Sequence, residues 1–445
     1  WISMNGKRRL KMKQLTRLFI PICLETLFYM LSGMVDTLML SAVGDYAVGA
    51  VGTANSYIGI FIIMFSIISS GMVSVMTQNI GAGRPGVAYQ ARQLGLLFNA
   101  VAGVLMAVFL FSGAGAILRM VGIADALYEP ALIYLKIVGG GCILNAVIPI
   151  FSSYLRAFGY TKQPLYATIV GNIANFVMNA VFLFVLHKGV AGVATATVIS
   201  KILNLCIVLY FSHKLISAKN STERIANKTV LGQIVKVGLP SACETALYNV
   251  AMMLVIRFLN QMDAEGLNVT ARSYTATISN FSYCVGAALA QANAIMTGWH
   301  IGAGELEECD RGTKRAAFVG VCVAVCMETA IVLGSGFIMP LFTDNPEMTA
   351  LVRKLLAIDI VLEIGRVTNL VFGQALKTSG DAVFPAVIAA VFMFVFAVGG
   401  TWLFGISMGL MAVGAYIGLA SDECVRAVGM VWRWKTGKWR TKKLV

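Results

Sequence analysis

The residues of this chain that are best suited to chemistry are acidic side chains inside long apolar runs. Glu25 and Asp36 lie in the first such run, and Glu244 lies in a later run, in a second copy of the motif Pro-x3-Glu-Thr. A carboxylate at membrane depth is costly and usually marks an ion pathway, a proton relay or an ion pair. These residues therefore predict the binding of a proton or another cation.

Glu25 and Asp36 are expected to share one helix face. Eleven residues separate them, which is about 20° past three full turns of an α-helix and about 16 Å along its axis. A cation could therefore meet the two carboxylates in sequence. A structural role for Asp36 at a helix end stays open, as does an ion pair between Glu25 or Glu244 and a neighbouring helix. Val255 takes the place of Asp36 in the second copy, so the two copies are expected to couple ions unequally.

A second polar helix face is predicted late in the chain. Asp359, Glu363 and Arg366 are spaced so that they share this face, and Asn369 follows them. A helix face this polar is not expected to contact lipid. Glu363 and Arg366 are also close enough for an intrahelical ion pair, so ion coupling and internal neutralisation are alternatives.

A row of asparagines supplies uncharged polar groups to a helix near the middle of the first half. Its members are Asn172, Asn175 and Asn179. Their spacing puts them on one face, where they could line a substrate path or hydrogen-bond to a neighbouring helix, and Asn145 could do either. Asp36, Asn175 and Asn179 form a possible Na⁺ site, although the sequence has no firm metal motif. Lys201 lies mid-helix and is expected to have a carboxylate partner.

Aromatic side chains lie close to the two repeated glutamates. Tyr29 and Phe28 follow Glu25, while Tyr248 and Asn249 follow Glu244. Aromatic faces attract organic cations, so Tyr29 and Tyr248 are candidates for a substrate cleft, and the polar Asn249 beside Tyr248 is a further candidate. Packing in a helix bundle is the alternative for each ring.

Composition indicates the elements that hold these residues. The chain is 58% hydrophobic and only 13% charged, with a mean hydropathy of +0.79, whereas about a quarter of a soluble protein is charged. Its apolar runs are long enough to cross about 30 Å of hydrocarbon as helices. The sequence thus predicts an all-α integral membrane protein with twelve spans, near 15–40, 47–77, 91–112, 127–155, 165–187, 190–213, 231–257, 268–298, 315–338, 348–376, 383–405 and 409–432.

The chain repeats itself at an offset of 219 to 221 residues. Pro21 and Glu25 match Pro240 and Glu244, and later motifs recur in the same order: Ile80-Gly-Ala-Gly83 with Ile301-Gly-Ala-Gly304, and Leu155-Arg156-x2-Gly159 with Leu376-Lys377-x2-Gly380. Six spans separate equivalent points, so the two six-helix halves should be related by an axis along the membrane normal. We expect lobes at 1–213 and 231–445, a cytoplasmic linker at 214–230, and helix bends at Pro21 and Pro240.

The positive net charge of the chain fits the distribution of basic residues in a membrane protein. The formal net charge is +14, and most Lys and Arg residues fall at the two termini and in alternate loops. The positive-inside rule then puts both termini in the cytoplasm of a multi-pass cell-membrane protein, such as one of a bacterial inner membrane. The basic clusters at residues 7–13 and 433–443 are expected to face lipid head groups rather than nucleic acid.

Several other classes of function lack their motifs. The sequence has no GxxxxGK[ST] phosphate loop and no HExxH metal motif, so neither ATP-driven transport nor a membrane-embedded enzyme is expected. Its nine cysteines include no CxxC pair, which argues against a zinc site or a disulfide framework. No catalytic residue and no organic cofactor is predicted.

Three motifs together resemble the multidrug and toxic compound extrusion (MATE) family of transporters. They are Met34-Val-Asp36-Thr followed by Gly44-x4-Gly49-x2-Gly52, Gln78-Asn-Ile-Gly-Ala-Gly83, and Leu155-Arg-Ala-Phe-Gly159. The resemblance covers all twelve predicted spans. It implies a secondary antiporter, working by alternating access, that exports small organic and mostly cationic compounds in exchange for H⁺ or Na⁺. It also makes Asp36 the first candidate for ion coupling and Pro21 the bend of the first helix.

The chain departs from the family pattern at two places. Many members have Asn-x3-Asp where this chain has Asn175-x3-Asn179, and Tyr248 takes the depth at which others have a glutamate in the seventh helix. Ion coupling is therefore expected to depend on the other acids: Glu25, Glu244, Asp359 or Glu363. A flippase for a lipid-linked precursor is the alternative function, and it would be expected to have a basic cleft. We expect a monomer.

Overall fold

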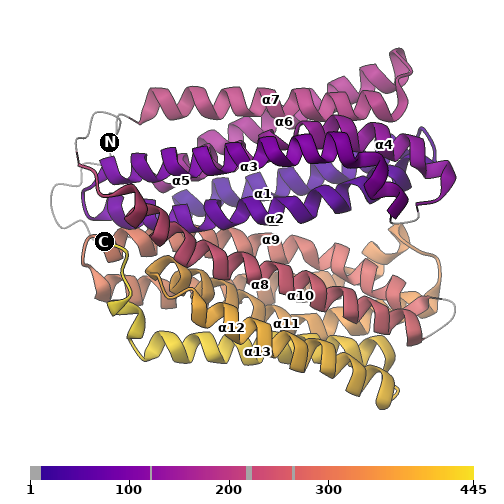
Figure 1. Cartoon of the computed structure of the whole chain (residues 1–445). Helices are drawn as coiled ribbons and strands as arrows, with labels where there is room; N and C mark the ends of the chain where they lie inside the picture. The colour runs from indigo at the N-terminus through magenta and orange to yellow at the C-terminus, as the bar shows by residue number, and fades with distance from the viewer. Residues whose placement is uncertain (1–11, 121–122, 217–222, 263–265) are drawn as a thin grey trace. The chain divides into compact units, whose positions relative to one another are not determined.

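The computed structural model describes residues 12–120, 123–216, 223–262 and 266–445 (Figure 1). These residues are helical and include no β-strand. Most of the basic cluster at 7–13 and the middle of the predicted linker at 214–230 lie outside the described residues.

One compact unit runs from Ile20 to Gly238. It is built from α1 (Met12–Ser41) after its first turns, α2 (Asp45–Gly81), α3 (Pro85–Met120), α4 (Asp125–Gly140), α5 (Cys142–Ala157), α6 (Lys162–Ala180), the π-helical turn η1 (Val181–Val185), α7 (Gly189–Leu215) and the start of α8 (Asn227–Met262). Its core is apolar and includes Ala54, Leu110 and Leu135. We call this the first unit.

The second unit comprises Leu239–Val445 and the part of α1 up to Phe19. It contains the rest of α8, α9 (Leu267–Gly302), α10 (Leu306–Ile338), η3 (Met339–Leu341), α11 (Pro346–Ser379), α12 (Val383–Phe392), the π-helical turns η4 (Met393–Val398) and η5 (Thr401–Ser407), α13 (Met411–Lys435) and η6 (Lys438–Thr441). Helix α11 is central, since it packs against α9, α10 and α13.

The boundaries between the two units fall within helices rather than in loops. Ile20 and Leu239, which begin the two stretches, directly precede Pro21 and Pro240. Both prolines lie inside continuous helices, α1 and α8. Proline cannot donate the backbone hydrogen bond that a helix interior normally forms, so each helix lacks one backbone hydrogen bond close to the boundary between the units.

The predicted twelve spans are present, although they differ in how apolar they are. Eight helices are long and apolar enough to cross a membrane, and the pair α4 and α5, bent by 42°, makes a ninth span. The remaining three are α9, α11 and α13, with 36, 34 and 25 residues. These three carry buried polar or charged side chains, which lowers their hydropathy without shortening them.

One predicted span is not a continuous helix. The run at 127–155 divides into α4 and α5 at Gly141, whose backbone angles are φ −84° and ψ 9°. Gly139, Gly140 and Gly141 are consecutive, and glycine is a weak helix former. Hydropathy alone could not show this break, because glycine does not interrupt an apolar run.

The internal repeat appears as repeated local structure. Gly83 and Gly304 have positive φ angles of 79° and 76°, and each ends a helix with the same two hydrogen bonds: Gly83 N to Ile80 O and Arg84 N to Asn79 O in one, Gly304 N to Ile301 O and Glu305 N to His300 O in the other. This is the glycine-terminated helix end that the sequence predicts. The π-helical turns η1 and η5 also recur at the repeat offset.

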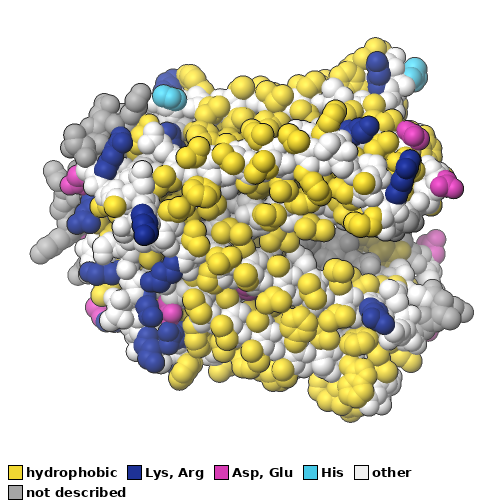
Figure 2. All heavy atoms as spheres, in the orientation of Figure 1, with side chains coloured by type: hydrophobic (Ala, Val, Ile, Leu, Met, Phe, Trp, Pro, Cys, Tyr) yellow, Lys and Arg dark blue, Asp and Glu magenta, His cyan; other side chains and the backbone are white. Residues whose placement is uncertain are grey.

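Hydrophobic side chains cover the middle of the helices on the face drawn in Figure 2, and Lys and Arg gather nearer the helix ends. On α3 the exposed residues Leu97, Val101, Leu105 and Val108 are each at least half exposed. Their spacing of three to four residues makes one apolar stripe. In a membrane this stripe faces lipid.

Candidate functional site

The asparagines of α6 face α1 inside the first unit. The Asn179 amide nitrogen donates to Asp36 Oδ1 at 2.8 Å and to Asn175 Oδ1 at 3.1 Å. Two turns away, the Asn172 amide donates to the Phe28 carbonyl at 2.9 Å. Asn175 and Asn179 are buried. The row therefore ties α6 to α1, and it presents donor groups rather than oxygen ligands to Asp36.

Lys201 of α7 is a positively charged neighbour of this arrangement. Its ammonium donates to Asn145 Oδ1 at 2.8 Å, and it is an electrostatic neighbour of Asp36. The sequence predicted a carboxylate as the direct partner, but the structure places an amide there. Asp36 and Lys201 thus place opposite charges near each other inside the first unit.

The repeated glutamates each form an ion pair with a repeated basic residue. Glu25 Oε1 lies 2.6 Å from Arg156 Nη2, and Glu244 Oε2 lies 2.8 Å from Lys377 Nζ. Arg156 and Lys377 occupy matching positions of the internal repeat. Both pairs join helices far apart in sequence, so the structure places Glu25 and Glu244 in interhelical contacts. The repeated sequence motifs included both basic residues, but nothing in the sequence indicated that they pair with Glu25 and Glu244.

A larger charged network fills the interior of the second unit. Glu363 pairs with Arg366 within α11, which is one of the two alternatives that the sequence left open, and Arg366 Nε lies 3.6 Å from Glu423 Oε1 on α13. Glu423 also accepts from Asn369 at 3.0 Å. Arg426 completes the network by pairing with Asp422 at 2.7 Å and Glu423 at 2.9 Å.

Three carboxylates of this interior come together. Glu328 of α10, Asp359 and Glu363 each offer an oxygen atom, and these atoms lie within 4.8 Å of one another. All three residues are buried, and Glu328 and Glu363 have no exposed surface. The sequence analysis missed Glu328, although a lone acid in the apolar run Val-Cys-Met-Glu-Thr-Ala-Ile was a signal for it.

The remaining predicted cleft residues lie on the surfaces of their units. Tyr29 is 74% exposed and Tyr248 is 40% exposed, and Asn249 is also exposed. Arg366 lies 5.7 Å from the Tyr283 ring, which brings one aromatic side chain of α9 to the charged network.

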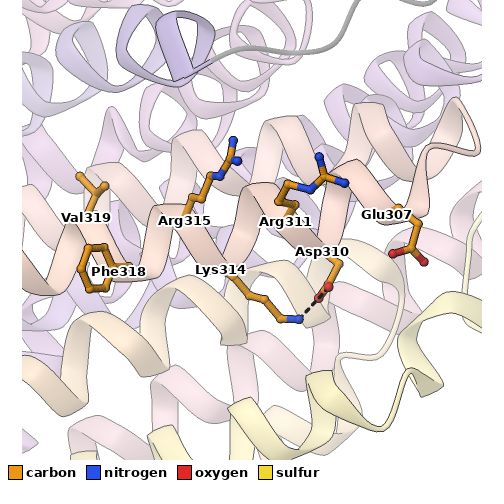
Figure 3. Close-up of a pocket in the computed structure, with 7 residues that line it drawn as sticks. All are labelled: Glu307, Asp310, Arg311, Lys314, Arg315, Phe318 and Val319. Carbon is orange, nitrogen blue, oxygen red and sulfur yellow. Dashed lines mark hydrogen bonds and ion pairs between the residues drawn. The ribbon is translucent and has the colours of Figure 1, made fainter.

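A separate polar pocket lies at the start of α10 (Figure 3). Its lining includes Arg311, Arg315 and the ion pair between Lys314 and Asp310, whose atoms are 2.7 Å apart. None of the predicted site residues lines this pocket. Its charged, open lining is that of a solvated helix end and differs from the buried carboxylate cluster.

The family comparison agrees with the internal repeat. The family model MatE matches residues 21–181 and 240–403, so its two copies begin at Pro21 and Pro240. The chain belongs to the MATE family of transporters. This result explains why the two units carry equivalent motifs at a fixed offset.

Two relatives and one solved structure cover nearly the whole MATE chain. It is 32% identical to the "Uncharacterized transporter YisQ" of Bacillus subtilis (strain 168) over 95% of this chain and 94% of the relative. It is 20% identical to the "Probable multidrug resistance protein NorM" of Thermotoga maritima over 97% of this chain and 94% of that relative. A structure described as the "Outward-facing conformation of a multidrug resistance MATE family transporter of the MOP superfamily" has a TM-score of 0.83 at 21% identity, with 96% of each chain covered. The fold is therefore that of a MATE transporter.

Proposed function

We propose that this MATE transporter is a secondary antiporter that exports small organic cations across the cell membrane in exchange for H⁺ or Na⁺. Family membership supports transport, and the relative named as a multidrug resistance protein supports export of drug-like compounds. Alternating access, a monomeric state and cytoplasmic termini are parts of the same proposal.

The observation that carries the proposal is an excess of buried negative charge in the second unit. Two arginines, Arg366 and Arg426, lie among five buried acids: Glu328, Asp359, Glu363, Asp422 and Glu423. Buried carboxylates without compensation are strongly unfavourable. A cation has to neutralise this excess at some stage of the cycle, which is the property that an ion-coupled exporter needs.

The candidate coupling acids are not equivalent. Glu25 and Glu244 have basic partners, and Asp36 has an asparagine donor with Lys201 nearby. Asp359 forms no ion pair among the described residues, and its Oδ2 has no hydrogen-bond partner there; Glu363 pairs with Arg366 but, like Glu25, has one oxygen without a hydrogen-bond partner. We therefore place coupling at Asp359 and Glu363 ahead of Asp36.

The flippase alternative receives no support from the basic residues. Arg156, Lys377, Arg366 and Arg426 each bind a carboxylate. Such bases have little capacity left for the phosphates of a lipid-linked precursor. Exposed tyrosines one turn after the paired glutamates, Tyr29 and Tyr248, suit a flat cationic substrate better.

Dye efflux from proteoliposomes tests the proposal. Purified protein is reconstituted with a cationic dye inside, and an inward Na⁺ gradient and an inward proton gradient are applied separately, with no gradient as the control. We expect one gradient to drive efflux of the cationic dye but not of an anionic dye of similar size. Efflux that needs no gradient, or that prefers the anionic dye, would overturn the assignment.

A further inference from the structure

We propose that a hollow between the end of α10 and the beginning of α11 binds the headgroup of one phospholipid that carries both a phosphate and a primary amine. Arg353 and Lys354 hold the phosphate, and Asp344 holds the amine; all three residues line the hollow. The site is independent of the proposed antiport, because it uses none of the acids to which ion coupling is assigned.

The hollow lies at the end of the second unit that is farthest from the C-terminus. Its volume is about 770 Å³, within the range of about 300–1,000 Å³ that is usual for small-ligand sites. Arg440, near the C-terminus, pairs with Glu307 at the beginning of α10. Helix α10 has 33 residues and is therefore about 50 Å long. The hollow at its other end is thus at the membrane surface opposite the C-terminus.

The connection between the two helices has a defined shape. Asn345 caps α11, since its side-chain oxygen accepts from the backbone nitrogens of Glu347 and Met348 at 2.9 and 3.3 Å. The Thr343 hydroxyl accepts from the Asn345 nitrogen at 3.1 Å, and the Thr349 hydroxyl donates to the Asn345 carbonyl at 3.1 Å. The rim of the hollow is therefore formed before a ligand binds, which lowers the entropic cost of binding.

The two basic residues of the hollow are adjacent and lack an acidic partner. Arg353 and Lys354 are both exposed, and neither forms an ion pair or a side-chain hydrogen bond within the described part of the chain. The planar guanidinium group of arginine matches the geometry of a phosphate, and lysine adds a compact positive charge. A phosphate bound here would relieve the repulsion between the two cations.

An acid on the rim of the hollow sets the kind of headgroup. Asp344 is exposed and has no basic partner among the described residues. A primary ammonium group offers three N–H donors to such a carboxylate. A headgroup with both a phosphate and an amine therefore satisfies both signs of charge, whereas a purely anionic headgroup would leave Asp344 unpaired.

Membrane orientation and folding do not explain the basic pair. The positive-inside rule places Lys and Arg on the side of the C-terminus, and Arg353 and Lys354 lie on the other side. At the repeat offset, their counterparts in α4 of the first unit are Leu132 and Ile133. One half of the molecule thus folds with two apolar residues at this position, which favours a role in binding for the charged pair.

An apolar stripe continues from the hollow along α11. Ala357 lines the hollow, and the exposed residues Val361 and Ile364 follow on the same helix face. The buried Asp359 and Glu363 lie on the opposite face. The stripe is therefore turned away from the charged interior of the unit, where acyl chains can contact it. A polar hollow that continues into such a stripe suits a phospholipid better than a soluble phosphate.

Native mass spectrometry of the purified, full-length protein tests the site. Delipidated protein is titrated separately with phosphatidylethanolamine, phosphatidylcholine and phosphatidylglycerol that have identical acyl chains. We expect one molecule of phosphatidylethanolamine to bind saturably and about tenfold more tightly than either other lipid, because only its headgroup pairs with both the basic residues and Asp344. Equal binding of the three lipids, or a preference for phosphatidylglycerol, would overturn the proposal.

A double variant tests the phosphate contact. Arg353→Leu with Lys354→Ile gives the second unit the residues of the first, and its apparent Kd for phosphatidylethanolamine should rise at least about tenfold. The control, Arg311→Leu with Arg315→Leu, removes two exposed positive charges from the beginning of α10 (Figure 3). It should bind the lipid as the unaltered chain does. An equal loss in both variants would show a response to overall charge and no specific site.

The variant Asp344→Asn tests the amine contact. It should bind phosphatidylethanolamine and phosphatidylcholine equally well, because the carboxylate that distinguishes their amines is gone. Asp344 is an exposed loop residue, so this variant tests the site even if the double variant does not fold. An unchanged preference for phosphatidylethanolamine would contradict the role of Asp344.

Glycerophosphoethanolamine separates a lipid from a soluble phosphate compound, because it has the same headgroup without acyl chains. At a concentration equal to that of the lipid, neither it nor inorganic phosphate should displace phosphatidylethanolamine, since neither buries apolar surface against the stripe. Displacement by either compound would identify a site for soluble phosphates and would rule out the lipid.

Discussion

At the scale of single residues, the two halves of the chain use the same ion pair. Glu25 with Arg156 and Glu244 with Lys377 are repeat-related, and the four side chains are between 12% and 21% exposed. An ion pair this deep is worth little as a gain in stability, but removing one partner leaves an uncompensated charge. The pairs therefore fix which helices meet more than they strengthen the fold.

The first prediction concerns the pair between Glu25 and Arg156. Glu25→Gln and Arg156→Met should each destabilise the protein by about 3 kcal/mol, because each leaves one charge unpaired. The double variant should lose much less than the sum of the two. Equilibrium unfolding in detergent measures this double-mutant cycle. Additive losses would show that the two residues do not act as a pair.

The second prediction restores the acid that the family pattern has at position 179. In Asn179→Asp, a carboxylate replaces the amide that donates to Asp36 at 2.8 Å, so two acids face each other. Protonation of either removes their repulsion, so the folded state binds more protons than the unfolded state and stability falls as pH rises. We expect a loss of about 2 kcal/mol between pH 5 and pH 8.

Asn179→Ala is the control for this variant, since it removes the hydrogen bond without adding a charge. It should be destabilised equally at both pH values. If the stability of Asn179→Asp is equally independent of pH, the repulsion between the two acids is absent. Lys201 would then neutralise both acids, which would contradict the prediction.

What the sequence could predict at this scale depends on where the partner lies. The pair between Glu363 and Arg366 was predictable, because both residues belong to one helix with a known period. Arg156, Lys377 and Glu328 meet their neighbours from other helices. One sequence gives the face of a residue but not the helix opposite that face, so these contacts needed the structure.

At the scale of elements, the beginning of α8 packs against α2 through two glycines of the first unit. A methyl group at Gly71 would lie 2.0 Å from the carbonyl oxygen of Ile234, and one at Gly238 would lie 1.7 Å from that of Ile67. Small residues permit such close contact between membrane helices. No larger side chain can replace these glycines without moving a backbone.

The third prediction tests this contact. Gly238→Ala should be destabilised by at least about 2 kcal/mol, because its methyl group overlaps the Ile67 carbonyl. Gly232→Ala on the same helix should be neutral or slightly stabilised, because nothing lies within 4 Å of its methyl group. The yield of folded protein and the Tm measure both. Equal behaviour of the two variants would contradict the contact.

The elements themselves were largely predictable, and the exceptions have a physical reason. The long apolar helices and the two helix ends at Gly83 and Gly304 could be predicted, because they depend on local sequence. The break at Gly141 and the continuous course of α1 and α8 between two units depend on packing. The three least apolar spans, α9, α11 and α13, turn their polar residues toward one another, which average hydropathy does not register.

At the scale of the whole molecule, the distribution of basic residues predicts how the helices are oriented in the membrane. Lys and Arg are concentrated at the termini and in alternate loops, and such loops are retained in the cytoplasm. In the second unit, α10 and α13 both begin and end within the described residues. An exposed residue just after each helix can therefore be labelled, one on each expected side of the membrane. Asp344 follows α10, and Thr436 follows α13.

The fourth prediction assigns these two positions to opposite sides of the membrane. In a cysteine-free background, Asp344→Cys should react with a membrane-impermeant maleimide in intact cells, whereas Thr436→Cys should react only after permeabilisation. The reason is that Thr436 lies within the C-terminal run of basic residues, which the positive-inside rule keeps in the cytoplasm. Labelling of Thr436→Cys in intact cells would show that the protein has the opposite orientation in the membrane. In that orientation, the carboxylates of the second unit could use only a cation gradient of the opposite direction.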